Sequence, residues 1–464
     1  MNDTTELIQA LAQQVVTVVK KSLSTVADPQ APTNLAWIET GLRDVLRQIG
    51  AEALGQWLSS AQGTPAAERP CACGGTLRYQ RYRAATVLSV FGRVTYERAY
   101  YAGCACGQGC APLDEAYGLQ AGHVSAGLAE LLTLAGVELA FDHSRRWLKG
   151  FLLFDVSENT IRQETQALGQ AQAAHETQLQ QQSQDPTWLQ THLRTRAPIP
   201  TRLYGSLDAA KVRIEPRTRA EKQAEPERWR DLKVGCWYEA EPVPSSQRST
   251  RQRAVLERGQ LSQRATNIRY YCDLVDAQVF GQLMWATGCA AQADLTRELV
   301  FVCDGAVWIW NLITTHYPHA VQIVDWYHAA DRLHRVAQAA FDQVASRQRW
   351  LEHTTTDLWE GRVTQVIQAC ATLAGHCADA QDALTYFTNN AARMRYDQYR
   401  AAGYLIGSGT VESSCKQIVT QRLKCSGAQW IRSGAVDTAK ARAAWLSEAW
   451  MPVCTRWSAL PLAV

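Results

Sequence analysis

Long apolar runs are missing from this sequence of 464 residues. A helix that crosses a bilayer needs about 20 consecutive apolar residues, and no segment approaches that length, so we expect no membrane-spanning helix. The first residues also lack the basic start and apolar stretch of a secretory signal. We therefore expect a cytoplasmic protein, whose 14 cysteines are reduced thiols or metal ligands rather than disulfides.

Net charge is also small, at +3, so the bulk charge does not indicate a nucleic-acid partner. Local charge is more informative, because residues 393–432 are rich in basic side chains with only Asp397 and Glu412 opposing them. The basic residues of this stretch are Arg393, Arg395, Arg400, Lys416, Arg422, Lys424 and Arg432. A basic zone of this kind suits a polyphosphate partner, and a solvated helix face is the alternative.

Three acidic residues stand directly after short apolar segments or turns. Asp208 closes the run 203–207, Asp304 closes the run 299–303, and Glu412 follows the turn 406–409 at the start of a helical stretch. A buried strand that ends in a carboxylate delivers an oxygen ligand to a sheet edge, and Mg²⁺ prefers oxygen ligands. The trio is expected to hold two Mg²⁺ (or Mn²⁺) ions about 4 Å apart for phosphodiester chemistry. Each acid taken alone is equally typical of a helix cap.

The second half of the chain has the alternating pattern of strands and helices that predicts a mixed sheet. The expected strands are 202–208, 232–238, 268–275, 299–303 and 320–324, with helices at 278–291 and 306–315. In such a sheet the first and fourth strands can lie side by side, which would bring Asp208 and Asp304 to neighbouring strand ends. Residues 329–392 then return to helical periodicity, with a break expected near Arg347.

Two further groups of residues could support the acidic trio. Asp325 ends another apolar run and is expected to cap the helix that carries His328, so the pair either orients a ligand, contacts DNA or is structural. Lys416 lies one turn after Glu412 and is expected to contact a phosphate or balance carboxylate charge.

Cysteine pairs surround a hairpin that is expected around Gly92. Each pair, Cys71 with Cys73 and Cys104 with Cys106, is followed by glycine, and four thiolates form a closed structural Zn²⁺ site. The usual zinc knuckle has two residues between its cysteines and these pairs have one, so free thiols remain an alternative. Cys110 is a possible substitute for a member of the second pair.

A helix-turn-helix-like region is expected after residue 121, with Ser157 as the N-cap of its second helix. Side chains suited to phosphates and base edges lie on the two helices. They are Arg145, Arg146 and Lys149 on the first, and Asn159, Arg162 and Gln163 on the second. Helix pairs of this kind also occur without DNA.

Several segments of the chain resemble the ISKra-type bacterial insertion-sequence transposases, which are DDE enzymes related to the Mutator-like group. The segments that carry the resemblance are Asp304–Leu312, Gln322–Ala329, Ile406–Lys416, Gly92–Thr95, Arg98–Tyr101, Pro112–Glu115 and Trp229–Gly235. One departure is Ala209, where the family usually has glycine after the first acid.

The resemblance implies an α/β protein whose RNase H-like mixed-sheet core is split by a helical insertion, with Asp208, Asp304 and Glu412 as the metal-binding triad. It also implies that Asp325 and His328 form an Asp-x-x-His pair, and that the DNA partners are terminal inverted repeats and target DNA. Because two ends must be joined, a homodimer or higher oligomer is expected, located in the bacterial cytoplasm at the nucleoid. Arg422 and Lys424 are expected to contact DNA near the site.

The expected regions follow from these motifs. They are a helical region at 1–65, a zinc-binding hairpin at 66–120, a helix-turn-helix-like region at 121–198, the first part of the core at 199–330, the insertion at 331–402 and the last core helices with a tail at 403–464. Two alternatives to a transposase stay open: a structure-specific nuclease on the same core, and a non-catalytic, zinc-dependent DNA-binding protein derived from a transposase.

Overall fold

The computed structural model describes residues 34–193, 199–216, 218–224, 227–243 and 263–448, with scattered positions before residue 34. The chain divides into two compact units, with the boundary after Thr165 inside helix α6 (Glu158–Gln182). Most of the part of the expected helical region 1–65 that precedes residue 34 lies outside the described residues. No described helix is both long and apolar enough to span a bilayer.

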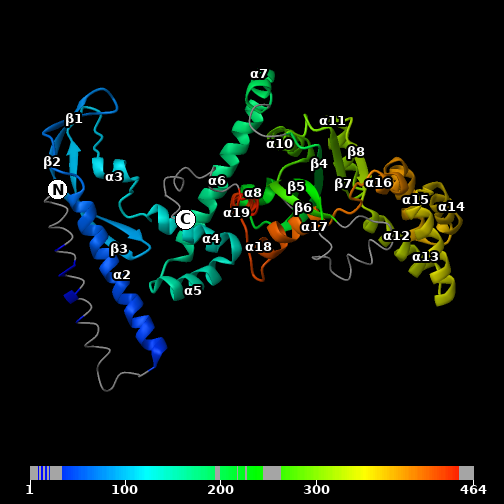
Figure 1. Ribbon diagram of the computed structural model, residues 1–464, viewed down its shortest axis with the longest axis horizontal. Coiled ribbons are helices and arrows are strands. Elements are labelled where there is room, and N and C mark those ends of the chain that lie inside the picture. Colours follow the sequence, from blue (N-terminus) through cyan, green and yellow to red (C-terminus); the bar gives the residue numbers. More distant parts are fainter. Residues whose placement is uncertain are drawn as a thin grey trace. The chain divides into compact units, whose positions relative to one another are not determined.

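The first unit combines a small antiparallel sheet with helices (Figure 1). Its elements before α6 are α2 (Leu35–Ser60), β1 (Glu68–Pro70), β2 (Thr76–Ser89), β3 (Gly92–Ala102), α3 (Pro112–Tyr117), α4 (Ala126–Glu138) and α5 (Phe141–Leu152). β2 and β3 pair antiparallel down to Ser89 and Gly92, which confirms the expected hairpin. Gly92 has φ +95°, a conformation that glycine adopts without a Cβ penalty.

β3 is an edge strand of this sheet. Side chains at the end of α2 and just beyond it form hydrogen bonds with the β3 backbone. Ser59 Oγ accepts the Glu97 N–H at 3.0 Å. The Gln62 carboxamide donates to the Glu97 carbonyl at 2.9 Å and accepts the Ala99 N–H at 2.7 Å. These side chains take the place of a neighbouring strand and leave fewer open backbone groups at the edge.

The second unit is built on a mixed five-stranded sheet in the order β6-β5-β4-β7-β8. The strands are β4 (Arg202–Arg213), β5 (Trp229–Pro242), β6 (Gln263–Asp273), β7 (Glu298–Cys303) and β8 (Val321–Val324). β4 pairs antiparallel with β5 and parallel with β7, and β7 pairs parallel with β8. All five expected strands are present, and the first and fourth of them lie side by side as predicted.

Helices cover both faces of this sheet (Figure 1). On one face the Trp237 indole N–H donates to Thr287 Oγ1 at 3.0 Å, in α10 (Ala277–Ala290). The neighbouring residue Cys236 faces the other way, toward Ser414 of α17 (Gly409–Cys415). α19 (Arg432–Leu446) packs on that second face against β6, and α11 (Val307–His316) packs against α10. Both α10 and α11 match helices expected from the sequence.

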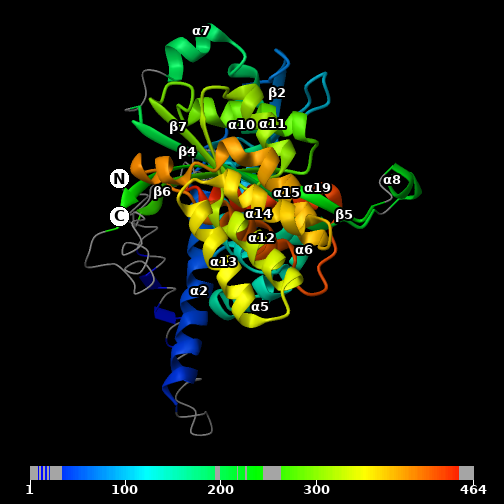
Figure 2. The ribbon, with the colours of Figure 1, turned by 90° about the vertical axis from the view of Figure 1, so that its right-hand side faces the viewer.

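A group of helices lies between β8 and α17 and gathers as one bundle in Figure 2. It comprises α12 (Trp326–Ala340), α13 (Val344–Trp359), α14 (Val363–Ala374), α15 (Ala378–Asn390) and α16 (Tyr396–Ala401). The break expected near Arg347 falls instead at residues 341–343, where Phe341 is extended. Arg347 lies within α13, and its guanidinium donates to the Phe341 carbonyl at 3.0 and 3.3 Å. The Arg347 side chain therefore stabilises the turn between α12 and α13 and does not interrupt α13.

Short elements complete the fold. They are α7 (Pro186–Trp188), η1 (Leu189–Leu193), α8 (Arg219–Ala224), η3 (Ala391–Arg393), η4 (Lys416–Thr420) and α18 (Gln421–Leu423). β4 and β5 extend further toward each other than the expected strands 202–208 and 232–238, and α8 lies between them in the sequence.

We expect Gly169→Ala to lower the free energy of unfolding by about 3 kcal/mol through overpacking. Gly169 lies on α6 against α19, and a Cβ there would come 1.8 Å from the backbone oxygen of Asp437. Urea unfolding followed by tryptophan fluorescence measures the change. Gly375→Ala is the matched control, since a Cβ at Gly375 meets no atom within 4 Å. Equal stability of the two variants would contradict the tight α6–α19 contact.

Candidate active site and metal centres

Asp208 and Asp304 occupy equivalent positions on adjacent parallel strands. The last paired residues of β4 and β7 are Gly205 and Phe301, and each acid lies three residues beyond its strand's paired residue. β4 continues to Arg213, so Asp208 lies inside this strand rather than at its end as expected, whereas Asp304 lies one residue past β7. The two strands are in contact at this level, because the Leu207 N–H donates to Cys303 Sγ at 3.3 Å. The mixed sheet therefore brings together two carboxylates that are far apart in sequence.

Helix α17 crosses this edge and brings Glu412 to it. α17 packs on β4 and β5, and the thiol of Cys415, on the same helix, hydrogen-bonds to the Asp208 carboxylate. Burial raises the pKa of Asp208, and the charge of Asp304 raises it further. Burial and repulsion of this kind are relieved when a divalent cation binds between carboxylates.

Asp325 forms hydrogen bonds with three separate segments of the site. Its side chain is fully buried; one oxygen accepts the His328 N–H at 2.6 Å and the other accepts the Ser408 N–H. Its own N–H donates to the Cys303 carbonyl at 2.8 Å. The residue thus connects the end of β7, the start of α12 and the turn before Glu412. The expected helix cap is confirmed, and the cap has a wider role than the sequence indicated.

His328 lies between two carboxylates. Its Nδ1 is 3.3 Å from Asp325 Oδ1 and 3.4 Å from Glu412 Oε1. The hydrogen bond to Asp325, with the nearby charges of Asp325, Glu412 and Asp304, raises the pKa of His328 to about 9. An imidazolium here neutralises part of the acidic cluster at neutral pH.

Potential ligand atoms of Asp325, His328 and Glu412 lie within 4.8 Å of one another. That close group includes neither Asp208 nor Asp304. Ser408 Oγ also hydrogen-bonds to Glu412 Oε1, at 3.1 Å. In this arrangement the Glu412 side chain is held toward His328, while its helix lies across the edge that carries the other two acids.

We expect Asp325→Ala to lower the free energy of unfolding by about 3–5 kcal/mol, because two buried backbone N–H groups lose their acceptor. Urea unfolding followed by tryptophan fluorescence measures this loss. Asp331→Ala is the matched control on the same helix, since Asp331 is exposed and pairs with Arg335 across one turn. We expect that control to change stability by less than about 0.5 kcal/mol. A similarly small effect of Asp325→Ala would contradict the role of Asp325 in connecting β7, α12 and the turn before Glu412.

Four thiols converge at the base of the hairpin in the first unit. The sulfurs of Cys71, Cys73, Cys104 and Cys106 lie within 4.8 Å of one another, with contacts of 3.6 Å between Cys71 and Cys106 and 3.4 Å between Cys73 and Cys104. Tetrahedral zinc with bonds of about 2.3 Å separates its sulfurs by about 3.8 Å. The cluster therefore could hold a zinc ion.

Glycines allow cysteine pairs with a single intervening residue to form this cluster. The Gly74 N–H donates to the Cys71 carbonyl and the Gly107 N–H to the Cys104 carbonyl, both at 2.9 Å, and both glycines have positive φ. The Gly75 N–H points at the Cys73 thiolate, and this hydrogen bond with those of the other thiols lowers the pKa of Cys73 to about 7. A Cβ on Gly75 would come 2.6 Å from Cys104 Sγ.

Cys110 lies outside this four-sulfur group. Its backbone instead pairs with Tyr101 in both directions at 2.9 Å, which continues the sheet. The structure therefore favours the four paired cysteines, and the possible substitution by Cys110 is not needed.

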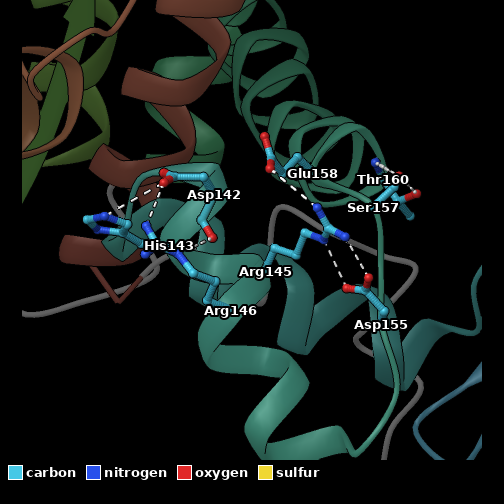
Figure 3. Close-up of polar contacts among 8 residues, drawn as sticks. All are labelled: Asp142, His143, Arg145, Arg146, Asp155, Ser157, Glu158 and Thr160. Atoms are coloured by element: carbon cyan, nitrogen blue, oxygen red, sulfur yellow. Dashed lines mark hydrogen bonds and ion pairs between the residues drawn. The ribbon is translucent and has the colours of Figure 1, made fainter.

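The helix-turn-helix-like region contains the expected helices α5 and α6, and Ser157 Oγ accepts the Thr160 N–H at 3.0 Å as the expected N-cap. Two of its arginines, Arg145 and Arg146, are held by acids (Figure 3). Arg145 forms two hydrogen bonds to Asp155, at 2.9 and 2.6 Å, and Arg146 pairs with Asp142 at 2.7 Å. Charges predicted to contact phosphates are therefore already partly neutralised.

The other residues predicted to contact DNA differ in exposure. Lys149, Asn159, Gln163, Lys416 and Lys424 are exposed, and Arg162 is half-buried. Arg422 is only 2% exposed, and its guanidinium lies 5.4 Å from the Trp430 ring centroid. The prediction that Arg422 contacts DNA is wrong for this structure, because its side of α18 turns into the packed core.

Comparisons with known protein families and with curated proteins do not identify a family for this sequence. A scan against protein-family models finds no match for this sequence. A search of curated proteins finds no similar sequence.

Proposed function

We propose that this chain is a DNA transposase with an RNase H-like catalytic core, which cuts and joins the inverted-repeat ends of an insertion sequence. The observation that carries the proposal is the equivalent placement of Asp208 and Asp304 on adjacent parallel strands, with the helix of Glu412 packed across the same edge. A mixed sheet followed by a helical bundle and then by the helix of the third acid agrees with a core split by an insertion.

In this proposal Asp208, Asp304 and Glu412 hold two Mg²⁺ or Mn²⁺ ions. Bound ions of this kind activate water or a 3′-hydroxyl and stabilise the leaving oxygen. Asp325 fixes the Ser408 turn against β7, so it positions Glu412 relative to Asp304. His328 balances charge beside Glu412, and the exposed Lys416 lies one turn further on, where it can contact a phosphate.

The proposed partners are double-stranded terminal repeats and target DNA, bound by a homodimer or higher oligomer because two ends must be joined. The cysteine cluster is proposed to hold a structural zinc ion that shapes the hairpin of the first unit. The proposed location is the bacterial cytoplasm, at the nucleoid.

A strand-transfer assay tests the proposal. Purified full-length protein is incubated with Mg²⁺, a labelled duplex that carries the element's terminal repeat, and a target plasmid. We expect labelled ends joined to the plasmid. Cleavage without joining would indicate a nuclease on the same core, and DNA binding without cleavage would indicate a non-catalytic DNA-binding protein.

A further inference from the structure

The hairpin of the first unit carries a cluster of arginines distinct from those of the helix-turn-helix-like region. β2 and β3 together contain Arg78, Arg81, Arg83, Arg93 and Arg98. Along β2, burial and exposure alternate except at Gln80–Ala84, where five consecutive residues are exposed. This level of the hairpin is therefore open to solvent, above the thiol cluster at its base.

Arg81 and Arg83 point to the same face of the hairpin. They pair across the strands with Tyr100 and Arg98, and alternate residues of a strand share a face. The guanidinium of Arg83 lies 3.6 Å from the Tyr100 ring centroid. Stacking on an aromatic face orients a guanidinium and leaves its in-plane N–H groups able to donate to a phosphate.

Carboxylates pair with Arg78 and Arg98 of the hairpin but, among the described residues, not with Arg81 and Arg83. Arg78 pairs with Glu68, and Arg98 pairs with Asp114 at 2.5 Å. Within the described part of the chain, Arg81 and Arg83 form no ion pair with a carboxylate. The closest acid along β3 is Glu97, which is opposite Ala84 and therefore faces away from the side shared by Arg81 and Arg83.

The surroundings of these arginines contrast with the α5–α6 turn. There, Arg145 and Arg146 are paired with Asp155 and Asp142, so that part of their charge is already compensated. On the hairpin, two adjacent positive charges remain on one exposed face with an aromatic ring beside them. A two-stranded ribbon of this width also fits the major groove of duplex DNA.

We propose that Arg81 and Arg83 form a phosphate-binding surface of the hairpin for duplex DNA, separate from the acidic site. This inference rests on the proposed function, because it takes DNA as the partner. It adds a contact surface in the first unit that the helix-turn-helix-like motif does not include. The contacts are to the backbone, so their contribution should be the same for different sequences.

The test is a titration of a fluorescent mixed-sequence duplex with the full-length protein over a series of salt concentrations. Log affinity falls with log salt, and each lost phosphate contact reduces the magnitude of this negative slope by about 0.9. For Arg81→Ala/Arg83→Ala we expect a slope smaller by about 2, with binding on the order of 50-fold weaker at 0.1 M salt. Arg81→Lys/Arg83→Lys keeps both charges and should retain most of the slope.

Arg78→Ala is the matched control, because it removes an exposed arginine of the same strand whose charge Glu68 already balances. We expect its salt slope to stay within about 0.3 of the original protein. Zinc content and melting temperature, measured for every variant, show that the hairpin stays folded; if the alanine variant loses zinc, the same measurement on Arg81→Gln/Arg83→Gln replaces it.

The outcomes separate this inference from the proposed function. An unchanged slope in the folded double variant, with DNA binding by the original protein intact, would overturn the hairpin surface alone. The hairpin surface would also be overturned if the double variant bound RNA more weakly than the original protein but bound duplex DNA equally well. If the original protein binds no duplex at any salt concentration, the proposed function fails together with this inference.

Discussion

Asp304→Ala should lower the rate of strand transfer at least about a thousandfold, because Asp304 is proposed to hold the metal ions that activate the attacking oxygen and stabilise the leaving oxygen. Asp304 lies one residue past β7, and its charge raises the pKa of Asp208. Removing the carboxylate also removes that repulsion, so the loss of activity is not expected to come from unfolding. The measurement is the initial rate of joining, with binding to the repeat DNA measured in parallel.

Asp331→Asn controls for the loss of one negative charge in the same unit. Asp331 is exposed on α12 and pairs with Arg335 at 3.4 Å, so we expect the control to join DNA at close to the original rate. DNA binding by Asp304→Ala should stay within about threefold of the original, since backbone contacts by basic residues dominate affinity. A variant that retains more than a tenth of the joining rate would remove Asp304 from the catalytic trio.

The sheet and the positions of the acids at its edge were predictable because strands leave a strong local signal. Runs such as 299–303 are apolar on both faces, as in a strand buried between helices. The thiol cluster was predictable for a similar reason: two cysteine pairs, each followed by glycine, surround one hairpin. In both cases the pattern within a few residues determines the structure, and the parallel pairing of β4 with β7 then follows from a short list of possible topologies.

Tertiary contacts decided what the sequence did not reveal. Asp325 was recognised as a cap, but its second contact, to the Ser408 N–H, joins residues 83 positions apart. The same holds for Arg422, whose inward direction depends on how α18 packs against its neighbours. The pairing of Arg145 with Asp155 could have been anticipated from their separation of 10 residues across one turn, whereas charge counts alone predicted a free cation.

Loss of the proposed zinc ion should have the largest effect on stability. Structural zinc sites contribute apparent binding free energies of about 10–16 kcal/mol in small domains, and the hairpin has only a small core beside the cluster, around Leu77, Ala99 and Tyr101. Purified protein should contain one zinc per chain, and Cys104→Ser should lose it. We expect the melting transition of the first unit to fall by at least about 10 °C, and the hairpin to become sensitive to limited proteolysis.

Cys110→Ser is the matched control, because Cys110 lies in the same loop, outside the four-sulfur group, and contributes its backbone to the sheet. This variant should keep its zinc and melt within about 2 °C of the original protein, as expected for a change of less than about 0.5 kcal/mol. The second unit has a large core of its own around Trp237 and Phe301, so its transition should be unchanged in both variants. If the original protein contains no zinc and melts at the same temperature as Cys104→Ser, the four thiols are brought together by packing alone and the zinc proposal is wrong.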